Sequence, residues 1–220
     1  MPGPRDWQSL VDGEFTDVQK LVHLVFRQTT DNEQAIRAEL VRARRREYED
    51  TLTAMLADSG CGGRGRLAEG PILSDLNEMS RTDAVSIVNT YNYDMAIALM
   101  AIRQENPRAN RGLYAKRLDQ WESKRAEWKN AQIALNVHLT ARSRAQADFM
   151  RNNGLDGRAR LQGPDPAAEP LCQGWLNRGW VKSEVANSNP SPFHPGCPHA
   201  WHHEIDKASV GDCEDLWTGQ

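Results

Sequence analysis

Residues 114–149, YAKRLDQWESKRAEWKNAQIALNVHLTARSRAQADF, decide the fold class of this 220-residue chain. Large side chains recur in this stretch every seven residues, and smaller apolar residues fill the companion positions. A stripe of this length is typical of a long helix that packs along one or two others at a shallow angle. We therefore expect a helix over residues 108–150, ended by a left-handed cap at residues 152–154. The members of the stripe are Tyr114, Trp121, Trp128, Leu135, Arg142 and Phe149.

A second helix is expected earlier in the chain, from about Thr16 to about Leu56, with a weak point at residues 29–32. Its apolar residues are three and four positions apart, which is typical of one buried face. Inside it lies a dense positive run, residues 42–46. The leading interpretation of this run is a solvated face balanced by neighbouring acidic residues. The functional alternative is a contact with packaged DNA or an acidic partner, through Arg42, Arg44, Arg45 and Arg46.

A third helix is predicted to begin near Pro71 and to end at Pro107. Its residues 96–102, AIALMAI, are apolar on nearly all sides, so we expect this to be the most buried helix. The preceding segment, residues 59–66 (SGCGGRGR), lacks both the strand and the Lys-Ser/Thr pair of a phosphate-binding loop. It is expected to be a flexible link. The functional alternative is that this segment binds a phosphate backbone.

The candidate chemistry is concentrated in residues 171–203, which hold two of the four cysteines and four of the six histidines. Zinc takes four tetrahedral nitrogen or sulfur ligands. Turn residues around His194 and Cys197 can fold these two side chains toward one point, and Cys172 would join them from beyond a short hairpin at residues 175–181. The stretch predicts a structural zinc site; the alternative is solvated histidines and small buried cysteines. The expected ligands are Cys172, His194, Cys197 and His199, with His202 as a substitute.

Four short motifs follow one another in this part of the chain: Thr140-Ala141-Arg142-Ser143-Arg144, Asn152-Asn153-Gly154, Cys172-Gln173-Gly174-Trp175 and Pro192-Phe193-His194-Pro195-Gly196-Cys197-Pro198-His199. In order and rough distance they resemble the C-terminal module of the Mu F-like minor head proteins of tailed bacteriophages, the phage head morphogenesis family. The resemblance covers residues 140–203, and its most specific part is the His-Pro-x-Cys box.

The chain departs from the family pattern at three places. The closing Cys-x-Cys is Cys197-x-His199 here, a change that zinc tolerates. The first cysteine of the family's upstream Cys-x-x-Cys falls at Glu169, which leaves only Cys172. The acidic residue that usually follows the helix arginine is replaced by Ser143 or Arg144.

The resemblance implies a structural minor head protein on the capsid interior near the portal, acting in head assembly or in DNA packaging and delivery. It implies multiple copies in the virion, assembly in the host cytoplasm, and the portal protein and other head proteins as partners, with packaged DNA as a further contact. The alternative is a cytoplasmic nucleic-acid-binding zinc protein with a helical oligomerisation domain, using the arginines of residues 42–46 and 158–160.

The charge, the apolar content and the motifs of the chain limit the classes of function that we expect for it. A formal charge of −3 and a pI near 6.1 give no overall attraction to nucleic acid or anionic membranes. No apolar run approaches the ~20 residues of a membrane span, so no membrane partner is expected. His203-Glu204 is not continued to His-Glu-x-x-His, and no catalytic motif is recognisable, so we do not expect an enzyme. In a reducing compartment Cys61 and Cys213 are expected to be free thiols.

The expected fold is mainly α, with long antiparallel helices forming an elongated helical body and a small, loop-rich α+β zinc-binding module at the C-terminal end. The expected divisions are an arm at residues 1–15, the long-helix body at 16–153, a linker at 154–170, and the zinc module with its tail at 171–220.

Overall fold

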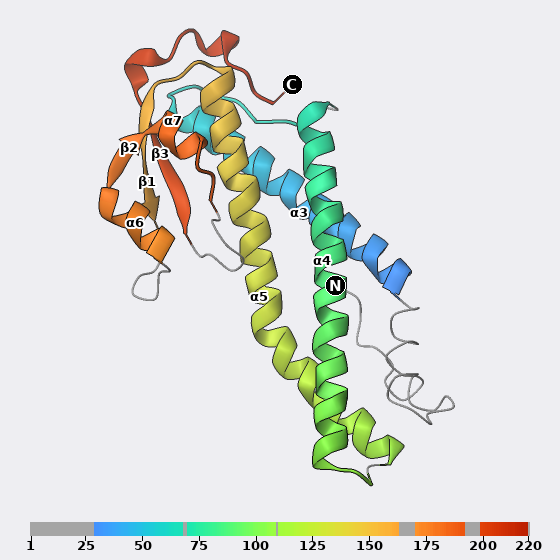
Figure 1. Cartoon of the computed structure of the whole chain (residues 1–220). Coiled ribbons are helices and arrows are strands. Elements are labelled where there is room, and N and C mark those ends of the chain that lie inside the picture. The colour runs from blue at the N-terminus through green and yellow to red at the C-terminus, as the bar shows by residue number, and fades with distance from the viewer. Residues whose placement is uncertain (1–28, 68–69, 109, 163–169, 192–198, 220) are drawn as a thin grey trace. The chain divides into compact units, whose positions relative to one another are not determined.

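The computed structural model describes residues 29–67, 70–108, 110–162, 170–191 and 199–219 (Figure 1). The expected arm at residues 1–15 and the expected helix start near Thr16 lie outside these ranges. Packing divides the chain into two units. The helical unit comprises Met1–Val41 and Glu78–Ala131, and the mixed unit comprises Arg42–Asn77 and Gln132–Gln220.

Three long helices supply most of the structure: α3 (Thr29–Asp58), α4 (Pro71–Glu105) and α5 (Arg111–Asn152). The predicted helix over residues 108–150 is therefore confirmed, and so is the one that begins at Pro71. At the start of α5 the Asn110 side chain accepts a hydrogen bond from the Leu113 amide at 3.0 Å, which satisfies an amide that has no partner inside the helix. At its end Gly154 has φ +58°, and the Leu155 amide donates to the Met150 carbonyl at 2.9 Å. This is the left-handed cap that the sequence predicts.

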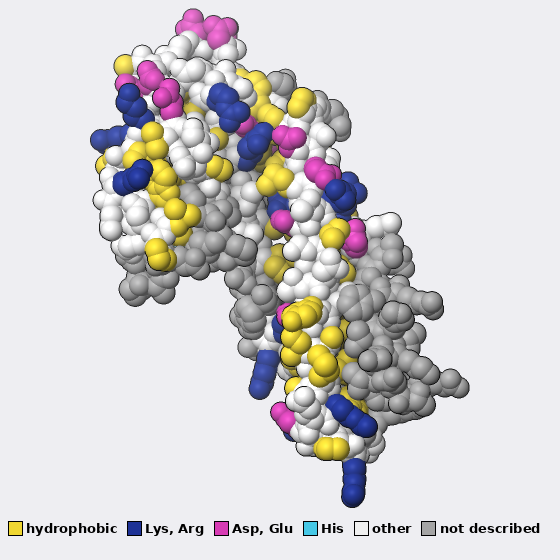
Figure 2. All heavy atoms as spheres, in the orientation of Figure 1, with side chains coloured by type: hydrophobic (Ala, Val, Ile, Leu, Met, Phe, Trp, Pro, Cys, Tyr) yellow, Lys and Arg dark blue, Asp and Glu magenta, His cyan; other side chains and the backbone are white. Residues whose placement is uncertain are grey.

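The core of the helical unit lies between α4 and α5. Met95, Leu99 and Ile102 on α4 pack against Tyr114, Ala115 and Leu118 on α5, so the two helices form an antiparallel hairpin. Residues 96–102 were expected to make this the most buried helix, but the α4 residues of this core share one face only. Ile97 is 45 % exposed and Met100 50 % exposed. Figure 2 shows hydrophobic side chains gathered on the surface of α4.

In the mixed unit, α3 and α5 meet around a buried carboxylate. The Tyr48 hydroxyl donates to Asp148 Oδ2 at 2.8 Å, and Arg144 Nε donates to the same oxygen at 2.8 Å. Arg144 also reaches Asp75 on α4 at 3.1 Å, and Arg151 lies 3.5 Å from Asp148. Burial, and then the Asp148 charge, raise the pKa of the Tyr48 hydroxyl above its usual value. The hydroxyl therefore stays protonated and serves as a fixed donor.

A three-stranded antiparallel sheet follows α5 in the mixed unit. Its strands are β1 (Gly157–Gln162), β2 (Trp180–Lys182) and β3 (Ala200–Ile205), in the order β2-β1-β3. Two helices connect them, α6 (Pro170–Arg178) and α7 (Ser183–Asn187). The central strand thus lies within residues 154–170, where a linker was expected, and α6 occupies most of residues 175–181, where a hairpin was expected.

Alternating side chains of the sheet form a small core. Ala159 and Leu161 of β1 and Trp201 of β3 pack with Ala186 of α7, and the Trp175 side chain of α6 packs against this cluster. The Trp175 and Trp201 rings meet edge to face with centroids 5.5 Å apart. One face of the sheet is therefore covered by helices.

After β3 the chain forms two short turns of 3₁₀-helix, Lys207–Ser209 and Cys213–Asp215, and returns to the link between α3 and α4. Cys213 forms a disulfide with Cys61, with Cα atoms 5.4 Å apart. The expectation of two free thiols is wrong, because 152 residues of sequence separation conceal that these segments meet.

Backbone hydrogen bonds hold the same tail in place. The Arg66 amide donates to the Thr218 carbonyl at 2.9 Å, and the Trp217 amide donates to Asn153 Oδ1 at 2.6 Å. Gly219 has φ +105°, and a Cβ there would overlap the Arg66 carbonyl oxygen, so only glycine fits. The tail therefore fixes the backbone of the link between α3 and α4.

Candidate functional site

Two of the four expected zinc ligands lie in the described part of the mixed unit. Cys172 on α6 is fully buried and His199, directly before β3, is 1 % exposed. His194 and Cys197 lie outside the described residues. Among the residues that the structure does describe, no three His, Cys, Asp or Glu side chains are grouped as a metal site would need. The zinc site therefore stays a prediction.

The sheet register places His199 near the end of β1. Gln162 pairs with Ala200, so His199 stands beside the point where the chain leaves β1 toward α6. His199 is two residues before Trp201 and is buried like it, so we infer that it continues the buried side of β3. Cys172 is one helical turn before Trp175 and shares its side of α6. Because the two tryptophans touch, we infer that both candidate ligands face the layer between α6 and the sheet.

The two histidines of β3 face opposite sides of the sheet. His203 faces the buried side, with its Nδ1 3.4 Å from Ser183 Oγ, and burial and then His202 lower its pKa to about 4. His202 belongs to the other side, where its ring centroid is 6.2 Å from that of Trp180. His199 is therefore better placed than the substitute His202 to share a site with Cys172.

The open side of the sheet carries an arginine–tryptophan cluster. The guanidinium groups of Arg158 and Arg160 lie 4.5 Å and 5.0 Å from the Trp180 ring centroid. Arg158 is also paired with Glu204 on β3 at 2.6 Å. These distances allow stabilising cation–π contacts.

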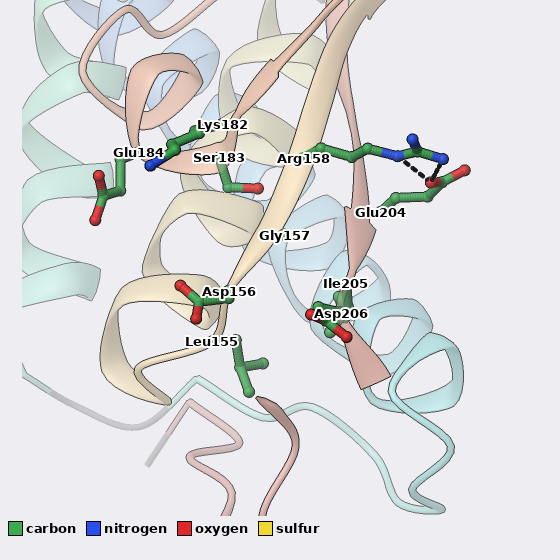
Figure 3. A pocket seen from close by; sticks show the side chains of 10 residues that line it. All are labelled: Leu155, Asp156, Gly157, Arg158, Lys182, Ser183, Glu184, Glu204, Ile205 and Asp206. Carbon is green, nitrogen blue, oxygen red and sulfur yellow. Dashed lines mark hydrogen bonds and ion pairs between the residues drawn. The ribbon is translucent and has the colours of Figure 1, made fainter. Parts of the chain in front are cut away.

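An open pocket of about 530 Å³ lies at the end of the sheet where β1 begins (Figure 3). The Arg158–Glu204 pair forms one wall, and the carboxylates of Asp156, Glu184 and Asp206 extend around the remainder. Lys182 is the other cation of the lining, so acidic groups outnumber basic ones. This composition argues against an anion site there.

The arginine run on α3 divides by burial. Arg42, Arg45 and Arg46 are exposed, whereas Arg44 is only 1 % exposed and so does not belong to the surface expected to contact nucleic acid. The physical reason is helix phase, because Arg44 is four residues from both Leu40 and Tyr48, which are buried. The four-residue spacing of Arg44 from these apolar residues could have predicted its burial from the sequence.

A second open pocket, of about 510 Å³, lies between α3 and residues 64–67; we call it the arginine groove. Arg45, Arg64 and Arg66 line it together with Glu49 and Asp50. Arg45 donates to Glu49 at 3.2 Å and to the Leu67 carbonyl at 3.0 Å. The fold thus unites two motifs that the sequence shows only as separate runs, and no sequence signal announced the pairing.

These observations define a mainly helical protein with a small antiparallel three-stranded sheet. No family model, no curated protein and no solved structure matches the chain. Within the described ranges, no helix has the length and apolar character needed to cross a membrane.

Proposed function

We propose that this protein is a structural, non-enzymatic minor head protein of a tailed bacteriophage. In this proposal several copies lie on the capsid interior near the portal, assembled in the host cytoplasm. They contact the portal protein and other head proteins, and act in head assembly or in DNA packaging and delivery. A structural zinc ion completes the C-terminal module.

The observation that supports this proposal is the burial of both Cys172 and His199. Both belong to the motifs that resemble the Mu F-like family. Cys172 lies on α6 and His199 directly precedes β3, and these two elements contact each other through Trp175 and Trp201. A thiolate and an imidazole are ligands that zinc prefers. With His194 and Cys197 they would supply four ligands, and the ion would hold together a module that has only a small apolar core.

Metal content tests the module. We expect elemental analysis of the purified full-length protein to find about one zinc per chain, in line with one four-ligand site. His199→Gln should lose the metal and lower the melting temperature. His202→Gln is the matched control, because His202 faces the other side of β3, and it should keep the metal. A wild-type protein without zinc, or loss of zinc in His202→Gln alone, would contradict this ligand set.

Binding to a portal tests the role in the head. Co-expressed with the portal protein of the phage that encodes it, the chain should co-sediment with portal rings. The alternative, a nucleic-acid-binding zinc protein with a helical oligomerisation domain, predicts oligomers and salt-dependent DNA binding with no portal association. Absence from the portal fraction, with both proteins folded, would refute the head role and leave the zinc result standing.

A further inference from the structure

We infer that the arginine groove between α3 and residues 64–67 is a binding site for the phosphate groups of a nucleic acid backbone. The inference is independent of the head role proposed above, since a head protein and a nucleic-acid-binding protein could both use such a site. It rests on three features of the groove: its charge balance, the state of its cations, and the rigidity of the backbone that carries them.

The first feature is an excess of positive charge in a concave surface. Arg45, Arg64 and Arg66 line the groove, against the carboxylates of Glu49 and Asp50. Both carboxylates are already engaged by arginines of α3. Arg45 lies 3.2 Å from Glu49, and Arg46 lies 3.7 Å from Asp50. The charges of the two carboxylates are therefore balanced by arginines of the same helix. Arg64 and Arg66 then give the groove its net positive charge.

The second feature is that the guanidinium groups of Arg64 and Arg66 are accessible to a ligand. Arg64 and Arg66 are exposed, and within the described residues neither forms an ion pair. Guanidinium groups bind phosphate oxygens through charge-assisted, often bidentate hydrogen bonds. Two such groups facing one groove suit a ligand with repeated phosphates better than one with a single charge.

The third feature is that the intervening backbone is fixed. Gly65 lies so close to α3 that a Cβ would overlap Leu52 Cβ, and its amide donates to Thr53 Oγ1 at 3.0 Å. After these residues in the chain, the Leu67 amide donates to Glu49 Oε1 at 3.0 Å. Before them, the Cys61–Cys213 disulfide anchors the segment. The Cα positions of Arg64 and Arg66 are therefore set before any ligand arrives, which lowers the cost of binding.

We assign the groove to a nucleic acid backbone because such a chain presents closely spaced phosphates, which allow both arginines to bind at once. Single strands and duplexes share this chemistry. The overall charge of −3 predicts that such binding depends on the groove alone and is weak at high salt.

The test measures binding of the full-length protein to a fluorescent 20-nucleotide strand and to its duplex, by anisotropy, between 50 and 200 mM salt. The variant is Arg64→Gln with Arg66→Gln. The matched control is Arg117→Gln with Arg142→Gln, which removes the same charge from exposed positions on α5. A thermal melt of each protein checks that it is folded.

The wild type and the control should bind, with affinity falling steeply as salt rises. Loss of two phosphate contacts should reduce the slope of log affinity against log salt by about 1.8 for the duplex and about 1.4 for the single strand. No binding at 50 mM salt, or equal losses in the variant and the control, would overturn the inference. So would poly-glutamate binding as tightly as DNA, because the groove would then be a site for acidic peptides.

Discussion

Removing the Cys61–Cys213 disulfide should destabilise the mixed unit without changing its native structure. The perturbation is Cys213→Ser, a near-isosteric change at an exposed side chain, so no buried space is created. The tail keeps its other attachments, the Arg66–Thr218 and Asn153–Trp217 hydrogen bonds. The effect should therefore arise in the unfolded chain, which gains conformational freedom when the cross-link is absent.

The size of the effect follows from the 152-residue separation of the two cysteines. Loop-closure entropy for a cross-link of this length corresponds to about 5 kcal/mol at 25 °C. A compact unfolded chain already restricts part of that freedom. We therefore expect a loss of about 2–4 kcal/mol in the free energy of unfolding, the range typical of native disulfides. With a urea dependence of about 2 kcal/mol per molar, the midpoint should fall by about 1–2 M.

The assay is urea unfolding followed by circular dichroism and tryptophan fluorescence, with and without a phosphine reductant. Reductant should lower the midpoint of the wild type to that of Cys213→Ser and should not change Cys213→Ser itself. That second comparison separates this disulfide from any effect of reductant on the other cysteines. Equal midpoints for oxidised and reduced wild type would refute the reasoning, provided that peptide mapping without reductant finds Cys61 joined to Cys213.

Two further substitutions test contacts inside the mixed unit. Tyr48→Phe removes a buried donor to the Asp148 carboxylate and should cost about 1.5–3 kcal/mol in denaturant unfolding; Tyr93→Phe, at an exposed hydroxyl, should cost nothing measurable, and equal effects would contradict the assigned contact. Gly157→Ala forces a Cβ against the backbone of β3 and should cost about 1–3 kcal/mol. Gly174→Ala, where a Cβ meets open space on α6, should stabilise by about 0.5–1 kcal/mol, and a reversed order would show that the register of β1 and β3 is wrong.

The long helices could be predicted because their signals are local. The seven-residue stripe of α5 and the proline and glycine at helix ends act over a few turns, and the structure follows them. The burial of α4 could not be judged in the same way. Its apolar composition gives no information on how many neighbours it has, and one α4 face in the helical unit stays exposed at Ile97 and Met100.

The sheet could not be predicted, because its pairing is not local. β1 contributes only Ala159 and Leu161 to the core, between exposed arginines and beside a segment rich in glycine and proline, which reads as a linker. Its partners are β2 and β3, and they begin at Trp180 and Ala200. That Cys172 and His199 belong to one metal-binding module stays a prediction, and the side of β3 on which each histidine lies depends on the register.

The contacts between the C-terminal tail and the link between α3 and α4 also set the order of events during synthesis of the chain. A ribosome adding about 5–20 residues per second needs roughly 8–30 s to travel from Cys61 to Cys213, 152 residues later. During that interval α3 and the segment around Arg66 have emerged but lack the tail that fixes them. The mixed unit must therefore complete its folding after residue 219 has left the ribosome.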